Sequence, residues 1–259
     1  MSIRRDSSIT VFFPAFNDAG TIVQLARDAL HVLPSLTSDY EVLVVNDGST
    51  DSTQHLLDKL AAMEPRVRII HHSRNLGYGA ALRTGFANST KDLVFYTDGD
   101  AQYDVRQIAE LYDLLSENVD IVNGYKKKRG DHAGRKVMGA LYNQAARLLF
   151  RLPIQDVDCD FRLLRREIVQ EVELTSTSGA ICVELIYKLK KAQARFAQTP
   201  IDHFPRLHGS SQFFTPPRVF ATAIDFSRLW LRLVLAPRLY ASHRNPRLAG
   251  KTTSTPEAT

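Results

Sequence analysis

The stretch Asp92-Leu-Val-Phe-Tyr-Thr-Asp-Gly-Asp100 is an apolar run that ends in two carboxylates separated by one glycine. A short apolar run bounded by polar residues is typical of a strand that is buried on both faces. Two earlier runs have the same form: Ile9-Thr-Val-Phe-Phe13, followed by Pro14, and Glu41-Val-Leu-Val-Val45, followed by Asn46. The sequence therefore predicts a sheet of buried strands whose ends carry the polar side chains.

Segments with helical periodicity separate these runs. Apolar residues recur at spacings of three and four in residues 21–33, 51–63, 78–87 and 105–115, and two further strands are predicted at 67–70 and 120–123. This alternation predicts an α/β fold, with a mostly parallel, Rossmann-like sheet flanked by helices. After residue 124 the pattern predicts helices over 135–150 and 181–192, an edge strand over 195–200, and a polar loop over 156–162.

The composition of the 259 residues is that of a globular protein, with 44% apolar and 24% charged residues, which excludes disorder of the whole chain. Two cysteines, Cys159 and Cys182, are too few for a disulfide framework or a four-thiolate zinc site, and they favour a reducing, cytoplasmic location. We expect no signal peptide, since no apolar run follows Arg4 and Arg5. We also expect no spanning helix, since every long apolar stretch contains charges.

The net charge of +5 is unevenly distributed. Residues 1–215 are balanced, whereas residues 216–259 hold seven Lys and Arg against two Asp and Glu. A second basic segment, residues 126–151, holds eight Lys and Arg against Asp131 alone. Such clusters favour an anionic partner, namely a phosphate, a nucleic acid or a membrane surface, although a solvated face has the same composition.

Ligands of parallel sheets bind outside the carboxyl ends of the strands, and candidate residues gather there in this chain. Asp98-Gly-Asp100 can hold Mg²⁺ or Mn²⁺ and leave positions free for phosphate oxygens, or it can simply cap the helix that begins at Val105. Asp47 can accept hydrogen bonds from a nucleobase or a ribose. The segment Gly77-Tyr-Gly79 lacks the third glycine of a dinucleotide fingerprint, because Leu82 stands in that position.

Four ordered motifs carry a family resemblance: Pro14-Ala-Phe-Asn-Asp18, Val45-Asn-Asp-Gly-Ser-Thr-Asp51, Arg74-Asn-Leu-Gly-Tyr-Gly-Ala-Ala-Leu82 and Thr97-Asp-Gly-Asp-Ala-Gln102. Together they resemble the family-2 glycosyltransferases of the GT-A fold, and within them the dolichyl- and polyprenyl-phosphate sugar synthases. Two later motifs extend the resemblance to about residue 215: Asp156-Val-Asp-Cys-Asp-Phe-Arg162 and Pro205-Arg-Leu-His-Gly-Ser-Ser211. The resemblance implies inverting transfer of a sugar from a nucleotide-diphosphate sugar to a polyprenyl phosphate, with Mg²⁺ or Mn²⁺ as cofactor, at the cytoplasmic face of a membrane.

The resemblance also implies a role for each matching position. The nucleotide sugar would be bound by Pro14, Asn17, Asp18, Asp47, Arg74, Gly77, Asp98, Arg206 and Ser210. The metal would be held by Asp98, Asp100 and Gln102, and the acceptor phosphate by Lys126 or Arg129 with Arg135. Asp156, Asp158 and Asp160 are the candidates for catalysis, either as a general base or as positioning groups. A lipid phosphate is already ionised near neutral pH and has little need of a base.

The chain departs from its relatives in three places. It has Cys159-Asp160 where relatives often have Ser-Gly, it shows none of the spanning helices of the membrane-anchored relatives, and it lacks the Gln-x-x-Arg-Trp motif of processive synthases. The last departure favours transfer of a single sugar. The main alternative is the same fold and donor with a soluble or glycan acceptor. A nucleic-acid-binding protein is a remote alternative, because the acids at the strand ends would repel phosphates. A homo-oligomer remains open.

The predicted organisation is a catalytic domain over residues 1–215, an amphipathic helix over 216–240 and a disordered tail over 241–259. The helix places Phe226 and Trp230 on one face and Arg228 and Arg232 on the other, as in helices that lie in a membrane interface. Alternatively, the helix packs on the catalytic domain or on a second subunit. Glu184 stands on an otherwise apolar helix and is expected either to contact the sugar or to form a structural ion pair.

Overall fold

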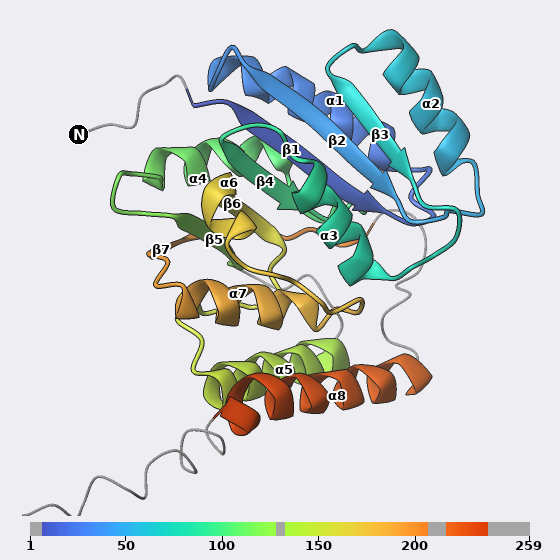
Figure 1. Cartoon of the computed structure of the whole chain (residues 1–259). Helices are drawn as coiled ribbons and strands as arrows, with labels where there is room; N and C mark the ends of the chain where they lie inside the picture. The colour runs from blue at the N-terminus through green and yellow to red at the C-terminus, as the bar shows by residue number, and fades with distance from the viewer. Residues whose placement is uncertain (1–6, 128–132, 207–215, 238–259) are drawn as a thin grey trace, which may run out of the picture.

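A seven-stranded sheet forms the centre of the computed structural model, which describes residues 7–127, 133–206 and 216–237 and, within these, no side chains for 133–137 and 216–220 (Figure 1). The strand order is β3-β2-β1-β4-β6-β5-β7. The strands are β1 (Ile9–Ala15), β2 (Tyr40–Asn46), β3 (Val67–His71), β4 (Leu93–Thr97), β5 (Ile121–Lys126), β6 (Phe161–Arg165) and β7 (Phe196–Ile201). All neighbours are parallel except the two pairs that β6 makes with β4 and β5, so the mostly parallel sheet is confirmed.

Helices cover both faces of the sheet (Figure 1). One face carries α1 (Ile22–Val32), α2 (Thr53–Met63) and α4 (Ile108–Leu114), and the other carries α3 (Tyr78–Asn88), α6 (Arg166–Gln170) and α7 (Ile181–Lys191). Short 3₁₀ turns, Leu33–Ser35 and Val105–Gln107, follow α1 and precede α4. The predicted helices and strands up to residue 124 are thus confirmed within a few residues of their expected ends.

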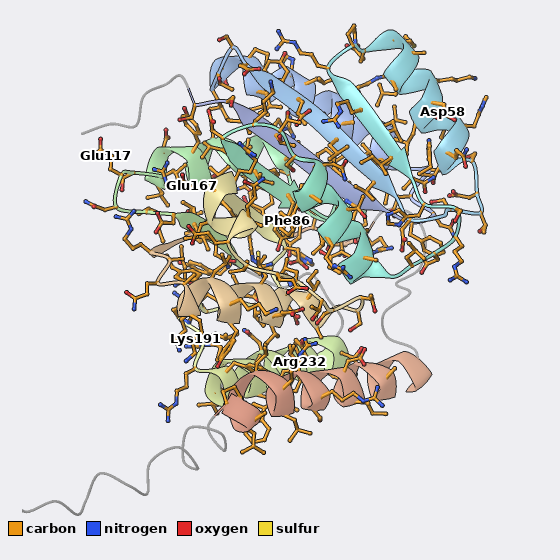
Figure 2. The ribbon with its side chains drawn as sticks, in the orientation of Figure 1. Asp58, Phe86, Glu117, Glu167, Lys191 and Arg232 are labelled. Atoms are coloured by element: carbon orange, nitrogen blue, oxygen red, sulfur yellow. The ribbon has the colours of Figure 1, made fainter. Side chains whose placement is uncertain are left out.

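Aromatic packing fixes α3 against the sheet. The rings of Phe12 and Tyr96 stack with centroids 5.4 Å apart, and Phe86, labelled in Figure 2, meets both edge-on. Gly85 makes this approach possible, since a β-carbon on it would lie 2.4 Å from the ring of Phe12. The last turns of α3 are therefore held against β1 and β4.

Two further helices form an outer layer next to α7 (Figure 1). These are α5 (Ala133–Phe150) and α8 (Pro216–Trp230), which continues as a π-helical turn, η3 (Leu231–Leu235). Phe226 of α8 lies 5.4 Å from Tyr142 and 5.3 Å from Phe150 of α5, measured between ring centroids. The Phe226 face is thus packed on the protein. These ring contacts agree with the packed-helix alternative, and contact of this helix with a membrane stays a prediction.

The expected disordered tail, 241–259, lies outside the described residues. No helix in the described part of the chain combines the length and the apolar character needed to cross a bilayer.

β6 is the strand that the sequence analysis did not predict. We expected Phe161 and Arg162 to end a polar loop, and this expectation is wrong, because both residues belong to β6. Arg162 pairs with Tyr96 of β4 on one side and with Asn123 of β5 on the other. An arginine is unusual in a strand buried on both faces, which is why the pattern indicated a loop.

The guanidinium of Arg162 is fully buried, and each of its three nitrogens donates a hydrogen bond. It donates to the carboxylate of Asp160 (2.7 Å), to the hydroxyl of Tyr96, to the side-chain oxygen of Asn123 and to the carbonyl of Val157. A buried charge is tolerated only when a counter-charge and hydrogen bonds replace its hydration. Arg162 therefore ties the 156–160 loop to both neighbouring strands.

Arg162→Met is expected to lower the free energy of unfolding by about 3–5 kcal/mol, because it leaves the buried Asp160 without its counter-charge. Chemical denaturation of the variant measures the loss. Adding Asp160→Asn to the same variant should restore part of it, since the double variant buries no unpaired charge. Arg83→Met, at an exposed position of α3, is the control and should change stability by less than about 0.5 kcal/mol. A loss below about 1 kcal/mol for Arg162→Met would contradict the structural role of this residue.

Candidate active site

The loops that follow β1, β2 and β4 meet at one edge of the sheet. Asn17 joins the first two, because its amide donates to the hydroxyl of Ser49 (2.9 Å) and its side-chain oxygen accepts from the amide of Thr50 (2.8 Å). The amide of Gly99, after β4, donates to the carbonyl of Pro14 in β1 (3.2 Å). Asn17 and Ala101 both adopt positive φ angles, 58° and 56°. Strained non-glycine residues of this kind cluster at functional sites.

Asp47 shapes the neighbouring loop from within. Its carboxylate accepts from the amides of Leu76 and Gly77, both at 2.9 Å, and lies 2.7 Å from Nδ1 of His72. Its side chain is nearly inaccessible, so it positions residues 74–77 instead of presenting a free carboxylate at the surface. Arg74 is an exposed residue of that loop and lies beside Gly48, where a β-carbon would come within 2.2 Å of the Arg74 backbone.

The two glycines around Tyr78 have a packing role. A β-carbon on Gly77 or Gly79 would lie 2.5 Å from the carbonyl oxygen of Thr177 or Ser176, respectively. The amide of Gly79 donates to the carbonyl of Thr177 (2.8 Å), so the first turn of α3 is packed on residues 175–178. Between the glycines, the hydroxyl of Tyr78 donates to Asp98 (2.8 Å). Tyr78 is a site residue that the sequence analysis missed; its position between the two glycines was the only signal.

Three carboxylates surround Gly99: Asp18, Asp98 and Asp100. Burial raises the pKa of Asp18 to about 6; the Phe16 amide opposes this shift and the charge of Asp100 adds to it. Burial also raises the pKa of Asp98 well above its usual range, and the charges of Asp160 and Asp100 add to the shift. Carboxylates that raise one another's pKa in this way favour a bound cation.

One cation already lies among these carboxylates. Arg206 donates to Oδ2 of Asp100, whose Oδ1 accepts from the amide of Gln102 (3.1 Å). The side-chain amide of Gln102 in turn donates to the carbonyl of Phe204 (3.1 Å). The structure thus brings together Asp98, Asp100, Gln102 and Arg206, as the sequence predicts.

The chemistry of these groups fits Mg²⁺ or Mn²⁺, because both ions prefer carboxylate and other hard oxygen ligands. In the described part of the chain no group of three or more His, Cys, Asp or Glu could hold a metal. Asp98 and Asp100 would therefore supply only part of the coordination, and a ligand with its own oxygens would have to supply the rest.

The three aspartates of the 156–160 loop have different environments. Asp160 pairs with Arg162 and also accepts from the thiol of Cys182 (3.2 Å), which makes it an internal anchor. Asp156 is buried, and its carbonyl accepts from Asn123 (3.3 Å). Asp158 is the least buried of the three, so it is the carboxylate best placed to meet a ligand. Burial raises the pKa of Cys159 to about 12, as expected for a packing residue and not for a nucleophile.

Lys126 reaches the same loop, where its ammonium donates to the carbonyl of Asp158 (3.0 Å). It is the one predicted acceptor-phosphate residue whose side chain is described. Arg129 and Ser210 lie outside the described residues, and so does the side chain of Arg135.

Glu184 forms the structural ion pairs that the sequence left as one of two alternatives. Its fully buried carboxylate accepts from the amides of Thr175 (3.2 Å) and Ser176 (2.7 Å) and pairs with Lys188 (2.8 Å) and Arg232 (3.2 Å), the latter labelled in Figure 2. Burial alone would raise the pKa of Glu184, but the bonds from Lys188, Ser176 and Thr175 outweigh burial and lower it to about 2. Glu184 thus holds residues 175–178 against the first turn of α3 and joins them to η3.

Glu184→Gln is expected to lower the free energy of unfolding at pH 7 by about 1–3 kcal/mol, because hydrogen bonds to a charged group are lost. Because the pKa of Glu184 is lower in the folded state than in the unfolded state, its charge stabilises the fold at pH values above the unfolded pKa, near 4.5. This stabilisation disappears as the pH falls towards the folded pKa of about 2. The difference between the variant and the wild type should therefore shrink between pH 5 and pH 2, as denaturation curves at several pH values can show. A difference that is constant over this range, or as small as that of the exposed control Glu171→Gln, would contradict the assignment.

Comparison with known proteins agrees with this geometry. The family model described as Glycosyl transferase family 2 matches residues 10–173. The chain is 28% identical over 246 residues to Glycosyltransferase AglD of Haloferax volcanii, and the alignment covers 89% of this chain but only 38% of that protein. The chain therefore spans well under half the length of this relative.

Solved structures of glucosyl-3-phosphoglycerate synthase from Mycobacterium tuberculosis share the fold. The complex with Mn²⁺, UDP and phosphoglyceric acid superposes with a TM-score of 0.67 at 18% identity, over 87% of this chain and 78% of that one. The complex with Mg²⁺ and UDP gives 0.64 at 18% identity, over 87% and 79%. The expected GT-A fold is thereby confirmed. Since the family model covers more than half of the chain and includes all four strand-end motifs, this chain belongs to glycosyltransferase family 2.

Proposed function

We propose that this glycosyltransferase moves one sugar, with inversion, from a nucleotide-diphosphate sugar to a polyprenyl phosphate. It uses Mg²⁺ or Mn²⁺ and works as a peripheral enzyme at the cytoplasmic face of a membrane. The structural neighbours that contain UDP with Mn²⁺ or Mg²⁺ support the donor half of this proposal. The carboxylates around Gly99 support it independently.

The donor would bind along the edge where the loops after β1, β2 and β4 meet. Asp98 and Asp100 would hold the metal, which neutralises charge on a departing diphosphate. Asn17 and Arg74 lie exposed beside this position and would contact the nucleotide. Asp47 would not contact the nucleotide directly and would instead hold in place the loop that carries Arg74.

The observation that carries the acceptor half is an exposed apolar stripe on α5. Met138, Leu141 and Leu148 are 43%, 66% and 66% exposed, and their spacing places them on one side of the helix. The opposite side is buried through Ala146 and Phe150. Large apolar side chains grouped at a surface mark an interaction site.

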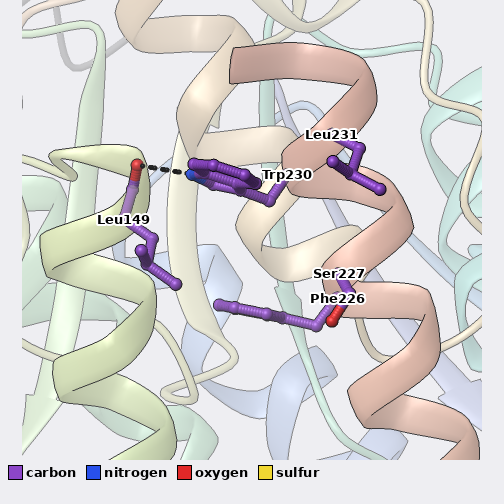
Figure 3. A pocket seen from close by; sticks show the side chains of 5 residues that line it. All are labelled: Leu149, Phe226, Ser227, Trp230 and Leu231. Atoms are coloured by element: carbon purple, nitrogen blue, oxygen red, sulfur yellow. Dashed lines mark hydrogen bonds between the residues drawn. The ribbon is translucent and has the colours of Figure 1, made fainter. Parts of the chain in front are cut away.

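The stripe continues towards α8. Leu149 and Leu231, 44% and 49% exposed, line a hollow of about 380 Å³ together with Phe226, Ser227 and Trp230 (Figure 3). Trp230 donates its ring N–H to the carbonyl of Leu149 (3.2 Å), so the two helices are joined at this point. The apolar surface therefore belongs to α5 and η3 together.

The charge around this surface fits an anionic membrane. The stripe lies within residues 126–151, which hold eight Lys and Arg against one Asp, and Arg147 of α5 is exposed. Apolar residues set among basic ones are typical of protein that lies in a membrane interface. A lipid held there would present its phosphate to Lys126, with Arg129 and Arg135 nearby in the sequence. Because this phosphate is already ionised, Asp158 would position it or its partners and need not act as a base.

A soluble acceptor is the second candidate. One of the structural neighbours contains phosphoglyceric acid, a small soluble phosphate. Lys126 would serve such a phosphate equally well, whereas the stripe on α5 would then have no role in catalysis.

Asp100→Asn is expected to preserve the fold, as circular dichroism can show, and to lower sugar transfer by about 100-fold or more. The physical reason is that a metal stabilises a charged leaving group by several kcal/mol, and about 1.4 kcal/mol corresponds to tenfold in rate. Asp113→Asn, at an exposed position of α4, is the control and should leave the rate unchanged. Full activity of Asp100→Asn, or of the wild type in excess chelator, would exclude the proposed metal role.

Leu141→Ser combined with Leu148→Ser is expected to weaken binding to vesicles of anionic lipid by about tenfold or more, because two exposed apolar anchors are lost. Co-sedimentation measures binding, which should also weaken with salt. Transfer to a long-chain polyprenyl phosphate in vesicles should fall in parallel, while transfer to a short, water-soluble prenyl phosphate should not.

Leu114→Ser, which removes a leucine of 42% exposure from α4, is the matched control and should bind vesicles like the wild type. If the wild type does not bind vesicles, or glycosylates a soluble phosphate as efficiently as the lipid, the soluble-acceptor alternative holds.

A further inference from the structure

Arg206 pairs with Asp100, one of the two carboxylates that would hold the metal in the proposed function. Its guanidinium donates to Oδ2 of Asp100, and the two side chains are 27% and 9% exposed. The carboxylates of Asp18 and Asp98 lie close enough to Asp100 for its charge to raise their pKa values. Arg206 therefore supplies positive charge to a crowded group of acids.

The backbone holds Arg206 in this place. The amide of Phe204 donates to the carbonyl of Gln102 (2.8 Å), and the side chain of Gln102 donates back to the carbonyl of Phe204 (3.1 Å). These two bonds join residues 203–206 to the turn that carries Asp100. The contact between Arg206 and Asp100 thus follows from how two segments of the chain, about 100 residues apart, are fastened together.

The guanidinium is incompletely satisfied in this position. Its Nε is buried and has no hydrogen-bond partner among the described residues. A buried donor without an acceptor costs free energy, and Arg is well suited to bind a phosphate group through two parallel N–H bonds. An acceptor with several oxygens would satisfy the group better than Asp100 alone does.

We infer that Arg206 and the divalent metal compete for Asp100, so that Arg206 neutralises this carboxylate in the donor-free protein and transfers its hydrogen bonds to the diphosphate when metal and donor bind together. This inference rests on the proposed donor site. A carboxylate oxygen that already accepts from a guanidinium binds a second cation less well, because the two positive charges repel each other. A diphosphate removes the conflict by offering negative oxygens to both cations.

Two consequences follow for binding. The donor-free protein binds the metal more weakly than its carboxylates would allow, because Arg206 must first leave Asp100. Metal and nucleoside diphosphate then bind cooperatively, and this coupling must be reciprocal. Removing the guanidinium should therefore have opposite effects on metal affinity with and without the nucleotide.

Titration with Mn²⁺ alone, followed by electron paramagnetic resonance of the free ion, tests the inference without any turnover. Arg206→Gln should bind Mn²⁺ about tenfold more tightly than the wild type, the ratio expected for losing one charge-assisted hydrogen bond of ordinary strength. In the presence of saturating UDP or GDP this advantage should disappear or reverse, because Arg206 then helps to bind the diphosphate. Arg106→Gln is the matched control, since Arg106 is exposed and pairs with Asp104, and no hydrogen bond or ion pair of the described residues joins it to Asp100.

Asp100→Asn separates failure of the inference from failure of the proposed function. If Asp100→Asn abolishes Mn²⁺ binding and Arg206→Gln leaves it within twofold of the wild type, the competition is excluded while the metal site stands. If Asp100→Asn binds Mn²⁺ like the wild type, Asp100 is not a metal ligand, and both the inference and the proposed metal role are excluded. The inference is supported if Arg206→Gln binds Mn²⁺ more tightly than the wild type without nucleotide, and if this difference disappears or reverses when the nucleotide is added.

Discussion

The buried guanidinium of Arg162 is the interaction on which the rest of the site depends. It donates hydrogen bonds to acceptors on β4, on β5 and in the 156–160 loop. It therefore fixes the position of that loop relative to both strands. Taking a guanidinium out of water costs several kcal/mol, and the cost is offset only when every donor finds an acceptor in good geometry. The arrangement of Tyr96, Asn123 and Asp160 around Arg162 is therefore tightly constrained.

Polar contacts and helix α7 together link Arg162 to the carboxylates at the strand ends. Asp160 accepts from Cys182 at the start of α7, and Glu184, two residues further along the same helix, accepts from the amides of Thr175 and Ser176. That loop packs against the first turn of α3, from which Tyr78 reaches Asp98. Helix α7 thus connects the buried core to the proposed donor site through Cys182 and Glu184 in its first turn.

The outer layer of α5 and α8 shows how two amphipathic helices share one protein surface. Each helix has apolar residues that need cover, and the structure buries the Phe226 side of α8 against the Phe150 side of α5. Leu141 and Leu148 remain uncovered on the far side of α5. The same layer is joined to the interior by the ion pair between Arg232 and Glu184. Because Glu184 also binds the amides of Thr175 and Ser176, the surface proposed to meet lipid is connected to the loop that packs on α3.

The sequence by itself determined the parallel part of the sheet, the helices that flank it and the strand-end motifs, because each depends on periodicity or spacing among near neighbours. It also placed Asp98, Asp100 and Gln102 together, since they stand on one short turn. Only the tertiary structure decided what Arg162, Glu184 and Asp47 do. Asp47 bonds residues 25 to 30 positions away, Glu184 pairs with Arg232 48 positions away, and Arg162 bonds Tyr96 and Asn123 on the two neighbouring strands. A local pattern carries no information about whether a buried charge finds such a distant partner. For the same reason the sequence predicted a helix over 135–150 and an amphipathic helix over 216–240, while the choice of which apolar side chains are covered depended on how α5, α7 and α8 pack together.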